Sequence, residues 1–203
     1  TVSVQVAGET LDEINETFTV DLSNAVNAVI ADGTGLGTIL DDDPLPALSI
    51  NDVTVTEPDT GTTSATFTVS LNAPSAHVVS VDYGTADGTA TAPADYAAGS
   101  GSVSFAAGET TKQVTVLVNG DLLDEANETY FVNLTNPTNA TIADNQGLGT
   151  ITDNDPLPSL SIDDVTVSEG NTGTVAATYT VTLTTVSGRS VTVDYATANG
   201  TAM

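Results

Sequence analysis

Apolar and polar residues alternate along most of this chain with a period of two. Val, Ile, Leu and aromatic residues take one set of positions and Thr and Ser take the other, which is typical of half-buried β-strands. No stretch keeps a helical period, so the pattern predicts an all-β protein built from antiparallel sandwiches. Between residues 47 and 155 the expected strands are Leu48–Thr56, Ala65–Leu71, Val78–Tyr83, Ser102–Phe105, Gln113–Val118, Thr129–Leu134 and Ala140–Thr152, the last bent near Asp144.

The alternating pattern is itself repeated. Residues 1–91 align without a gap with residues 113–203, and about 54 of these 91 pairs are identical. The spacing is kept while surface residues differ between the two copies. The offset of 112 residues therefore reflects a structural repeat.

Two proline-containing connectors mark the edges of the repeats. Pro-Leu-Pro occurs at 44–46 and again at 156–158, and proline would remove hydrogen bonds from the middle of a sheet. We therefore expect tandem immunoglobulin-like β-sandwich modules, a complete one having an ordinary size for that fold. The expected parts are the C-terminal part of a first module at 1–43, a complete module at 47–155, and the N-terminal part of a third at 159–203.

The charge of the chain limits the classes of partner that it can bind. It has 27 acidic residues against 2 basic ones, a formal net charge of −25, and no cysteine. This balance argues against nucleic acid and anionic membranes, which need Lys or Arg, and the lack of cysteine excludes disulfides and thiolate metal sites. No apolar run approaches the roughly 20 residues of a membrane span, and no signal peptide begins the chain, so we expect a segment of a longer protein with no membrane insertion here.

The acidic residues gather in segments that are far apart in the sequence. Glu57 ends the first strand, Asp95 lies in the loop after Tyr83, a cluster occupies 121–128, and another follows the last strand at 153–155. We expect these segments to meet at one pole of the sandwich, where uncompensated carboxylates would repel one another. Oxygen ligands without His or Cys suit Ca²⁺ rather than zinc. The alternative interpretation is a solvated acidic cap.

Several of these segments also carry a family resemblance. Residues 81–90 (VDYGTADGTA), 94–96 (ADY), 124–129 (DEANET) and 153–155 (DND) resemble motifs of the Calx-β domain, a β-sandwich known from sodium–calcium exchangers and large bacterial surface proteins. Gly120 and Asn154 stand where the family often has Asp, which implies fewer ions or weaker binding. The resemblance implies calcium ligands at Glu57, Asp95, Asp121, Glu125, Glu128, Asp153 and Asp155.

The flanking segments contain the matching acids of their own modules. The resemblance implies that Glu9, Glu13, Glu16, Asp41, Asp42 and Asp43 belong to the site of the first module. It likewise assigns Glu169 to a third site. Both sites are expected to be incomplete, because their remaining ligands would lie outside the sequence.

Other features do not indicate catalysis. His77 is the only histidine, its repeat counterpart is Arg189, and no G-x-S-x-G motif occurs, so we expect an exposed turn residue at His77 and no enzyme. Paired carboxylates occur in glycosidases, but the aromatic residues here fall on strand positions and Trp is absent. The Gly35-Leu36-Gly37 pattern is interpreted as a bend or bulge in a strand.

The expected role is a calcium-stiffened stalk or adhesion spacer in a large extracellular or cell-surface protein. Its partners would be calcium ions and neighbouring modules, with self-assembly or a cell-surface ligand left open. Alternatives are a calcium sensor module that regulates an attached domain and the subunit of an extracellular fibre. For Asp52 and Asp163-Asp164, which follow the connectors, both a role in the junction and simple turn capping remain open.

Overall fold

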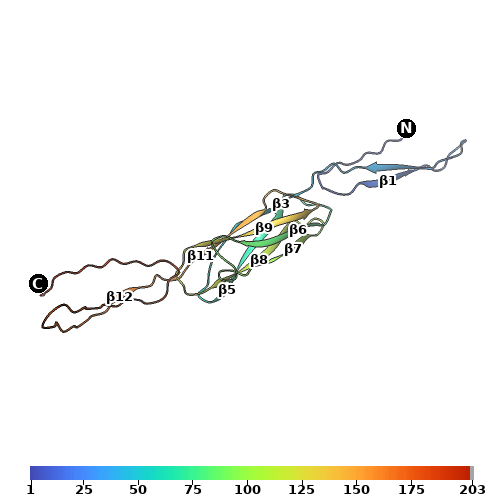
Figure 1. Cartoon of the computed structure of the whole chain (residues 1–203). Coiled ribbons are helices and arrows are strands. Elements are labelled where there is room, and N and C mark those ends of the chain that lie inside the picture. Colours follow the sequence, from blue (N-terminus) through green and yellow to red (C-terminus); the bar gives the residue numbers. More distant parts are fainter. Residues whose placement is uncertain (202–203) are drawn as a thin grey trace.

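The computed structural model describes residues 1–201 and is all-β, with no helix among them. A central β-sandwich carries a hairpin segment at each of its two ends, so the molecule is elongated (Figure 1). Within the described residues there is no helix of the length and apolar character needed to cross a membrane. The prediction of an all-β sandwich fold is confirmed.

The central sandwich consists of two sheets. One has the strand order β10-β3-β5-β8 and the other the order β4-β11-β9-β6-β7. All pairings within them are antiparallel except β10 with β3 and β4 with β11, which are parallel. The strands are β3 (Ala47–Ile50), β4 (Val53–Thr56), β5 (Gly61–Leu71), β6 (Val79–Asp87), β7 (Ser100–Phe105), β8 (Thr111–Gly120), β9 (Glu128–Thr138), β10 (Thr141–Ile142) and β11 (Gln146–Thr152).

Apolar side chains from both sheets fill the space between them. In β5 every second residue from Ala65 to Leu71 is buried, as the period of two requires. Three fully buried aromatic rings form the centre of this core. The ring of Tyr130 stacks on that of Tyr96 with centroids 4.5 Å apart and meets the ring of Phe67 edge-on at 6.1 Å.

The expected strand Leu48–Thr56 is divided into β3 and β4, because the chain passes from one sheet to the other at Asn51-Asp52. Asn51 Oδ1 accepts a hydrogen bond from Thr68 N (2.6 Å) on β5, and Asp52 Oδ1 accepts one from Leu148 N (2.8 Å) on β11. Asp52 therefore caps the crossing within its own module, as the turn-capping alternative predicts.

A similar interruption separates β10 from β11. Asp144 Oδ1 accepts a hydrogen bond from Gln146 N (3.2 Å), so the chain bends at the residue where the sequence predicts it. In the C-terminal segment Asp163 is the repeat counterpart of Asn51, and its Oδ1 accepts the equivalent hydrogen bond, from Thr180 N (2.7 Å).

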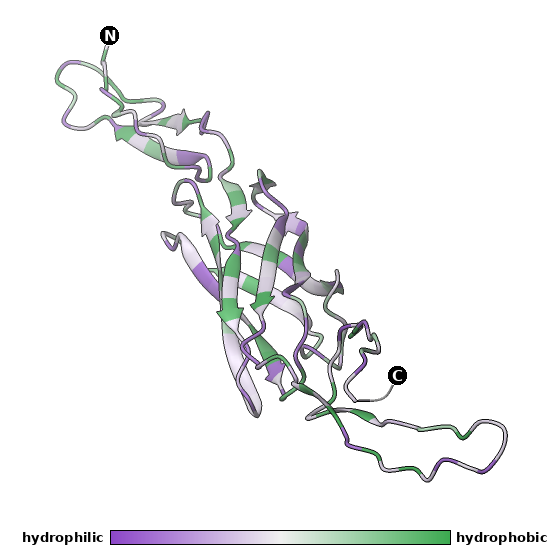
Figure 2. Cartoon of the chain, turned by 90° about the vertical axis from the view of Figure 1, so that its left-hand side faces the viewer, coloured by the Kyte–Doolittle hydropathy of each residue, from purple (hydrophilic) through white to green (hydrophobic). Residues whose placement is uncertain are grey.

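The two terminal segments contain the hairpins β1 (Glu16–Asp21) with β2 (Thr34–Ile39) and β12 (Leu160–Ile162) with β13 (Val181–Leu183). Their core-type residues face solvent: Val4 is 50% exposed and Ile162 62%, whereas the counterparts Val116 and Ile50 in the sandwich are each 4% exposed. Apolar colour therefore runs along both outer segments as well as through the sandwich (Figure 2). Burial of these positions requires both sheets of a module.

The sequence predicts a bend or bulge at Gly35-Leu36-Gly37, and the structure contains no bulge there or at the matching Gly147-Leu148-Gly149. Residues 35–37 and 147–149 pair in regular antiparallel register with β1 and β9. A Cβ atom at Gly149 would collide with the ring of Tyr130, and one at Gly37 with the ring of Phe18. Glycine is needed here because an aromatic side chain of the neighbouring strand lies across it.

We expect Gly149→Ala to lower the free energy of unfolding by about 1–3 kcal/mol, because the added methyl group displaces the buried Tyr130 ring. Urea denaturation of the full chain measures this loss. Gly99→Ala is the matched control, since a Cβ atom there has nothing within 4 Å. Equal stability of the two variants would contradict the packing role of Gly149.

Candidate metal centre

The parallel pairing of β4 with β11 brings the first acids together. Both strands end at the same pole of the sandwich, with Thr56 opposite Thr152. Glu57 directly follows β4, and its N–H donates to Thr152 O (3.2 Å). Asp153 and Asp155 follow β11, so the three carboxylates converge. The Glu57 cluster (Glu57, Asp153 and Asp155) has one oxygen from each side chain within 4.8 Å of the others.

A second cluster forms beside it from three other parts of the chain. The Asp95 cluster (Asp95, Glu125 and Glu128) also has its oxygens within 4.8 Å of one another. Glu128 begins β9, Glu125 lies in the loop between β8 and β9, and Asp95 lies in the loop between β6 and β7.

Hydrogen bonds fix the loops that carry these acids. Thr91 N donates to Asp95 Oδ2 (2.7 Å), and Asn119 N donates to Asp95 O (2.9 Å). Asn127 Oδ1 accepts from Asp153 N (3.2 Å), which ties the β8–β9 loop to the segment after β11. The same tie recurs in the N-terminal segment, where Asn15 Oδ1 accepts from Asp41 N (2.9 Å). The two acidic segments of each module are therefore held together by an asparagine.

Crowding and burial change the protonation of the pole. Burial, and then the charges of Asp121 and Asp153, raise the pKa of Glu57 to about 7. Burial and the neighbouring Asp95 raise the pKa of Glu128 to about 7. The pKa values of Glu125 and Asp155 are also raised, in each case first by burial and then by nearby carboxylates. A divalent cation would reverse the charge part of these shifts.

The donor set fits calcium. Asp155 is 9% exposed, and its buried Oδ2 atom accepts no hydrogen bond within the described chain. A buried carboxylate oxygen without a partner is costly, and a cation would satisfy it. The cationic side chain that approaches these clusters is Arg189, whose Nη2 lies 3.9 Å from Asp153 Oδ2. Six carboxylates in two clusters are hard oxygen ligands of the kind that Ca²⁺ prefers.

The structure therefore brings six of the seven acids proposed for the complete module into the two clusters. Asp121 lies outside both and is exposed, but its charge raises the pKa values of Glu57 and Glu125, so it faces the same pole. Glu169 is exposed and belongs to no such cluster within residues 1–201.

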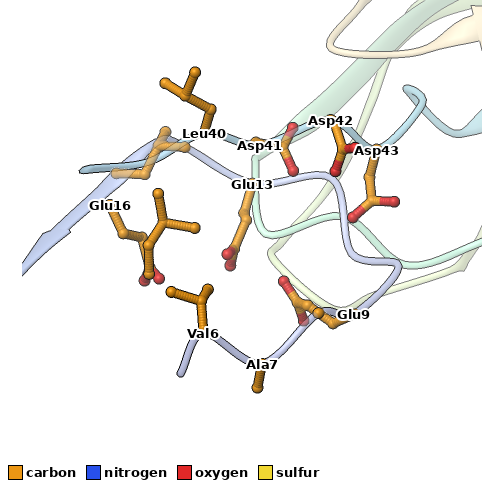
Figure 3. Close-up of a pocket in the computed structure, with 12 residues that line it drawn as sticks. Val6, Ala7, Glu9, Glu13, Glu16, Leu40, Asp41, Asp42 and Asp43 are labelled. Carbon is orange, nitrogen blue, oxygen red and sulfur yellow. The ribbon is translucent and has the colours of Figure 1, made fainter. Parts of the chain in front are cut away.

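The acids of the N-terminal segment share one pocket. Burial and the neighbouring Glu9 raise the pKa of Glu13 in this pocket. Within the described residues they form no cluster as tight as those of the sandwich. The carboxylates that line the pocket are Glu9, Glu13, Glu16, Asp41, Asp42 and Asp43 (Figure 3).

Sequence reasoning assigned no separate role to Asp124, which has different partners from its acidic neighbours. It is 2% exposed, accepts hydrogen bonds from Ser187 Oγ (2.9 Å) and Arg189 Nε (3.3 Å), and forms an ion pair with Arg189 Nη2. The Arg189 guanidinium lowers the pKa of this carboxyl. His77, expected to be exposed, is half-buried in its turn. The sequence signal that could have revealed the Asp124–Arg189 contact is the repeat alignment, which pairs His77 with Arg189 and Asp12 with Asp124.

The family model of the Calx-beta domain matches residues 40–157 and again residues 152–203. This chain belongs to the Calx-beta domain family. Calx-beta domains are calcium-binding modules, and the carboxylate clusters lie within the longer of the two matches. A comparison with curated proteins finds no significant match.

A comparison with solved structures finds the following similar chains. "CBD12 from CALX1.2" has a TM-score of 0.51 and 24% identity, over 61% of this chain and 53% of that one. The "apo-form Calx CBD1 domain" has a TM-score of 0.48 and 23% identity, over 55% of this chain and 100% of that one. The "calcium binding domain CBD12 of CALX1.1" has a TM-score of 0.49 and 25% identity, over 53% of this chain and 44% of that one.

In metal-free protein we expect stability to fall as the pH rises from 5 to 8. Folding raises the pKa of Glu57 from 4.5 to about 7, so between these values the folded state binds more protons than the unfolded state. The stabilisation is complete below the unfolded pKa and is lost as the pH passes through the folded one, at about 1.4 kcal/mol per pH unit for one proton. Urea denaturation of metal-stripped protein measures the slope.

The control for this slope is Glu57→Gln, which keeps the shape of the side chain but cannot ionise. We expect the variant to have a shallower dependence on pH, with the remainder arising from Glu128 and its neighbours. A slope of the opposite sign in the parent chain would contradict the raised pKa values.

Proposed function

We propose that this chain binds Ca²⁺ at the acidic pole of its complete module and serves as a calcium-stiffened spacer in an extracellular or cell-surface protein. The observation that carries the proposal is the pair of carboxylate clusters with the unpartnered, buried Asp155 Oδ2. The ligands would come from the two clusters, with Asp121 as the exposed seventh carboxylate. The ion would supply counter-charge to six carboxylates that have only the Arg189 guanidinium nearby.

The spacer role is supported by the arrangement of the chain. The sandwich and its two flanking segments follow one another along one direction (Figures 1 and 2). The acidic pole lies at the end of the sandwich from which the C-terminal segment leaves, since Asp155 is followed directly by the Pro-Leu-Pro connector. A cation bound there would stiffen the region where two modules meet. A repeated module with a short connector favours an architectural role over a single sensor.

The extracellular assignment rests on calcium concentration. Extracellular calcium modules bind with Kd values of about 10⁻⁴–10⁻³ M, and the substitutions Gly120 and Asn154 remove two carboxylates from this pole. A site of that affinity fills where calcium is millimolar. The ligand for a cell-surface or adhesive role would be bound elsewhere in the parent protein or by other copies of the module.

A thermal melt of the full chain in chelator and in calcium tests metal binding. For a Kd of about 10⁻⁴–10⁻³ M, about 10 mM calcium should stabilise the folded state by roughly 1.4–2.7 kcal/mol per ion. We expect a rise in Tm of several degrees, since about 1 kcal/mol shifts a module of this size by roughly 4–8 °C. Magnesium at the same concentration should produce a smaller rise, because it prefers a stricter octahedral set.

Variants assign the effect to the pole. Asp155→Asn and Glu125→Gln should each remove most of the calcium-dependent rise in Tm, whereas Asp144→Asn should keep it, because that side chain caps a turn away from the clusters. Identical melts of the parent chain in chelator and in calcium would mean that the acids form a solvated cap.

A further inference from the structure

Both junctions of the chain contain the same contact. At the first junction the buried Asp12 of the N-terminal segment meets Ser75 of the sandwich, and at the second the buried Asp124 of the sandwich meets Ser187 of the C-terminal segment. The partners are separated by 63 residues in each case. The two contacts are therefore equivalent in the repeat, although one lies at each end of the sandwich.

The contact uses one backbone bond and one side-chain bond. At the first junction Ala76 N donates to Asp12 O (2.9 Å), and Ser75 Oγ donates to Asp12 Oδ2 (2.5 Å). The same hydroxyl accepts a hydrogen bond from His77 N (3.0 Å). Ser75 thus uses both its donor and an acceptor site, which fixes the direction of its O–H bond toward the aspartate.

The second junction reproduces this geometry with different neighbours. Gly188 N donates to Asp124 O (3.0 Å), and Ser187 Oγ donates to Asp124 Oδ2 (2.9 Å). Arg189 N in turn donates to Ser187 Oγ (3.1 Å). We call this arrangement the aspartate–serine latch.

The latch has no need of a metal ion. Asp12 and Asp124 are 6% and 2% exposed, and neither belongs to the Glu57 cluster or the Asp95 cluster. A carboxylate so deeply buried is costly unless it is hydrogen-bonded, and here the serine hydroxyl of the next module bonds it, while a backbone N–H of that module bonds the carbonyl oxygen of the same aspartate. Undocking would leave the aspartate without these partners.

The residue two positions after the serine differs between the junctions. At the first it is His77, and at the second it is Arg189, whose guanidinium holds both carboxylate oxygens of Asp124. Two-point binding of a carboxylate by Arg is among the stronger side-chain contacts. The second latch is therefore the tighter one.

The second latch also touches the metal centre. A Cβ atom at Gly188 would lie 2.8 Å from Glu125 Cγ, so the backbone of the next module lies directly against the Asp95 cluster. Arg189 Nη2 lies 3.9 Å from Asp153 Oδ2 of the Glu57 cluster. The docked turn thus lies against both carboxylate clusters of the acidic pole.

We propose that the aspartate–serine latch is the repeated lock between consecutive modules, that it forms without calcium, and that the residue at position 77 or 189 sets its strength. The surface that it joins is the β8–β9 loop of one module and the turn after β5 of the next. In a longer array each module would offer both halves, so the partner of either exposed half is another module of the same kind.

Hydrogen exchange of the full chain tests the latch. Arg189 is the only arginine, so its Nε–H gives a single NMR signal, and the amides of Ala76 and Gly188 report the backbone bonds of the two junctions. In chelator we expect all three protons to exchange at least about tenfold more slowly than unstructured ones. Exchange at unstructured rates in chelator would overturn the proposal, as would protection that appears only on addition of calcium.

Variants separate the latch from general folding. Ser187 lies outside the sandwich, so Ser187→Ala should lower the protection of Gly188 and Arg189 Nε–H several-fold while amides of the sandwich core keep theirs. Ser168→Ala, an exposed serine of the same segment for which the structure gives no hydrogen bond, is the control and should change nothing. Unchanged protection in Ser187→Ala would contradict the latch.

Swapping His77 and Arg189 between the two junctions tests whether this residue sets the strength of the latch. His77→Arg should slow exchange of the Ala76 amide roughly threefold or more, because Arg can hold both oxygens of Asp12, and Arg189→His should speed exchange of Gly188 by a similar factor. If neither variant changed its amide exchange rate, the residue at position 77 or 189 would not set the strength of the latch. Calcium titration of the same spectra reports the acidic clusters separately, so loss of calcium binding and loss of the latch are distinguishable.

Discussion

The parallel pairing of β4 with β11 determines where the charge of this module lies. Neighbouring parallel strands end at the same edge, so the residues that follow them are side by side whatever their distance in sequence. Glu57 and Asp153 are separated by almost the whole module and still share one cluster. The crossing at Asn51-Asp52 makes this possible, because it moves the chain from the sheet of β3 to the sheet of β11 before the acid is reached.

The aromatic core supports the other cluster. Tyr96 directly follows Asp95, and Tyr130 comes two residues after Glu128. Because the two tyrosine rings stack in the core, the acids beside them are anchored by the same contact. Tyr96 Oη also donates to Asp87 Oδ1 (2.6 Å), which anchors the β6–β7 loop to the end of β6. The pole is therefore held in place by the packing beneath it even though its charges repel one another.

Much of the fold and of the acidic pole could be predicted from the sequence, because a period of two and an ungapped repeat are strong local signals. The strand break at Asn51-Asp52 was missed, although the apolar positions change phase there, from Leu48 and Ile50 to Val53 and Val55. The phase change does not say that the chain crosses to the other sheet, because only the neighbouring strands decide that. Of the bend or bulge expected at Gly-Leu-Gly, the bulge is absent, and the reason also lies in a neighbouring strand. Glycine at 149 is explained by a ring on another strand, and the sequence around it contains no sign of that ring.

Asp124 shows most clearly what a charge pattern conceals. It stands beside Glu125 in one acidic run, yet the two carboxylates have different partners. That of Asp124 bonds Ser187 of the next module, and that of Glu125 belongs to the Asp95 cluster. A loop that serves both tasks cannot move at one without affecting the other, because the backbone between adjacent residues is continuous. Gly188 lies against Glu125 while its N–H bonds Asp124 O, so docking of the next module restricts the loop on both sides. The latch would thus preorganise Glu125 for a cation, and the ion would in turn hold the loop in the position that the latch requires.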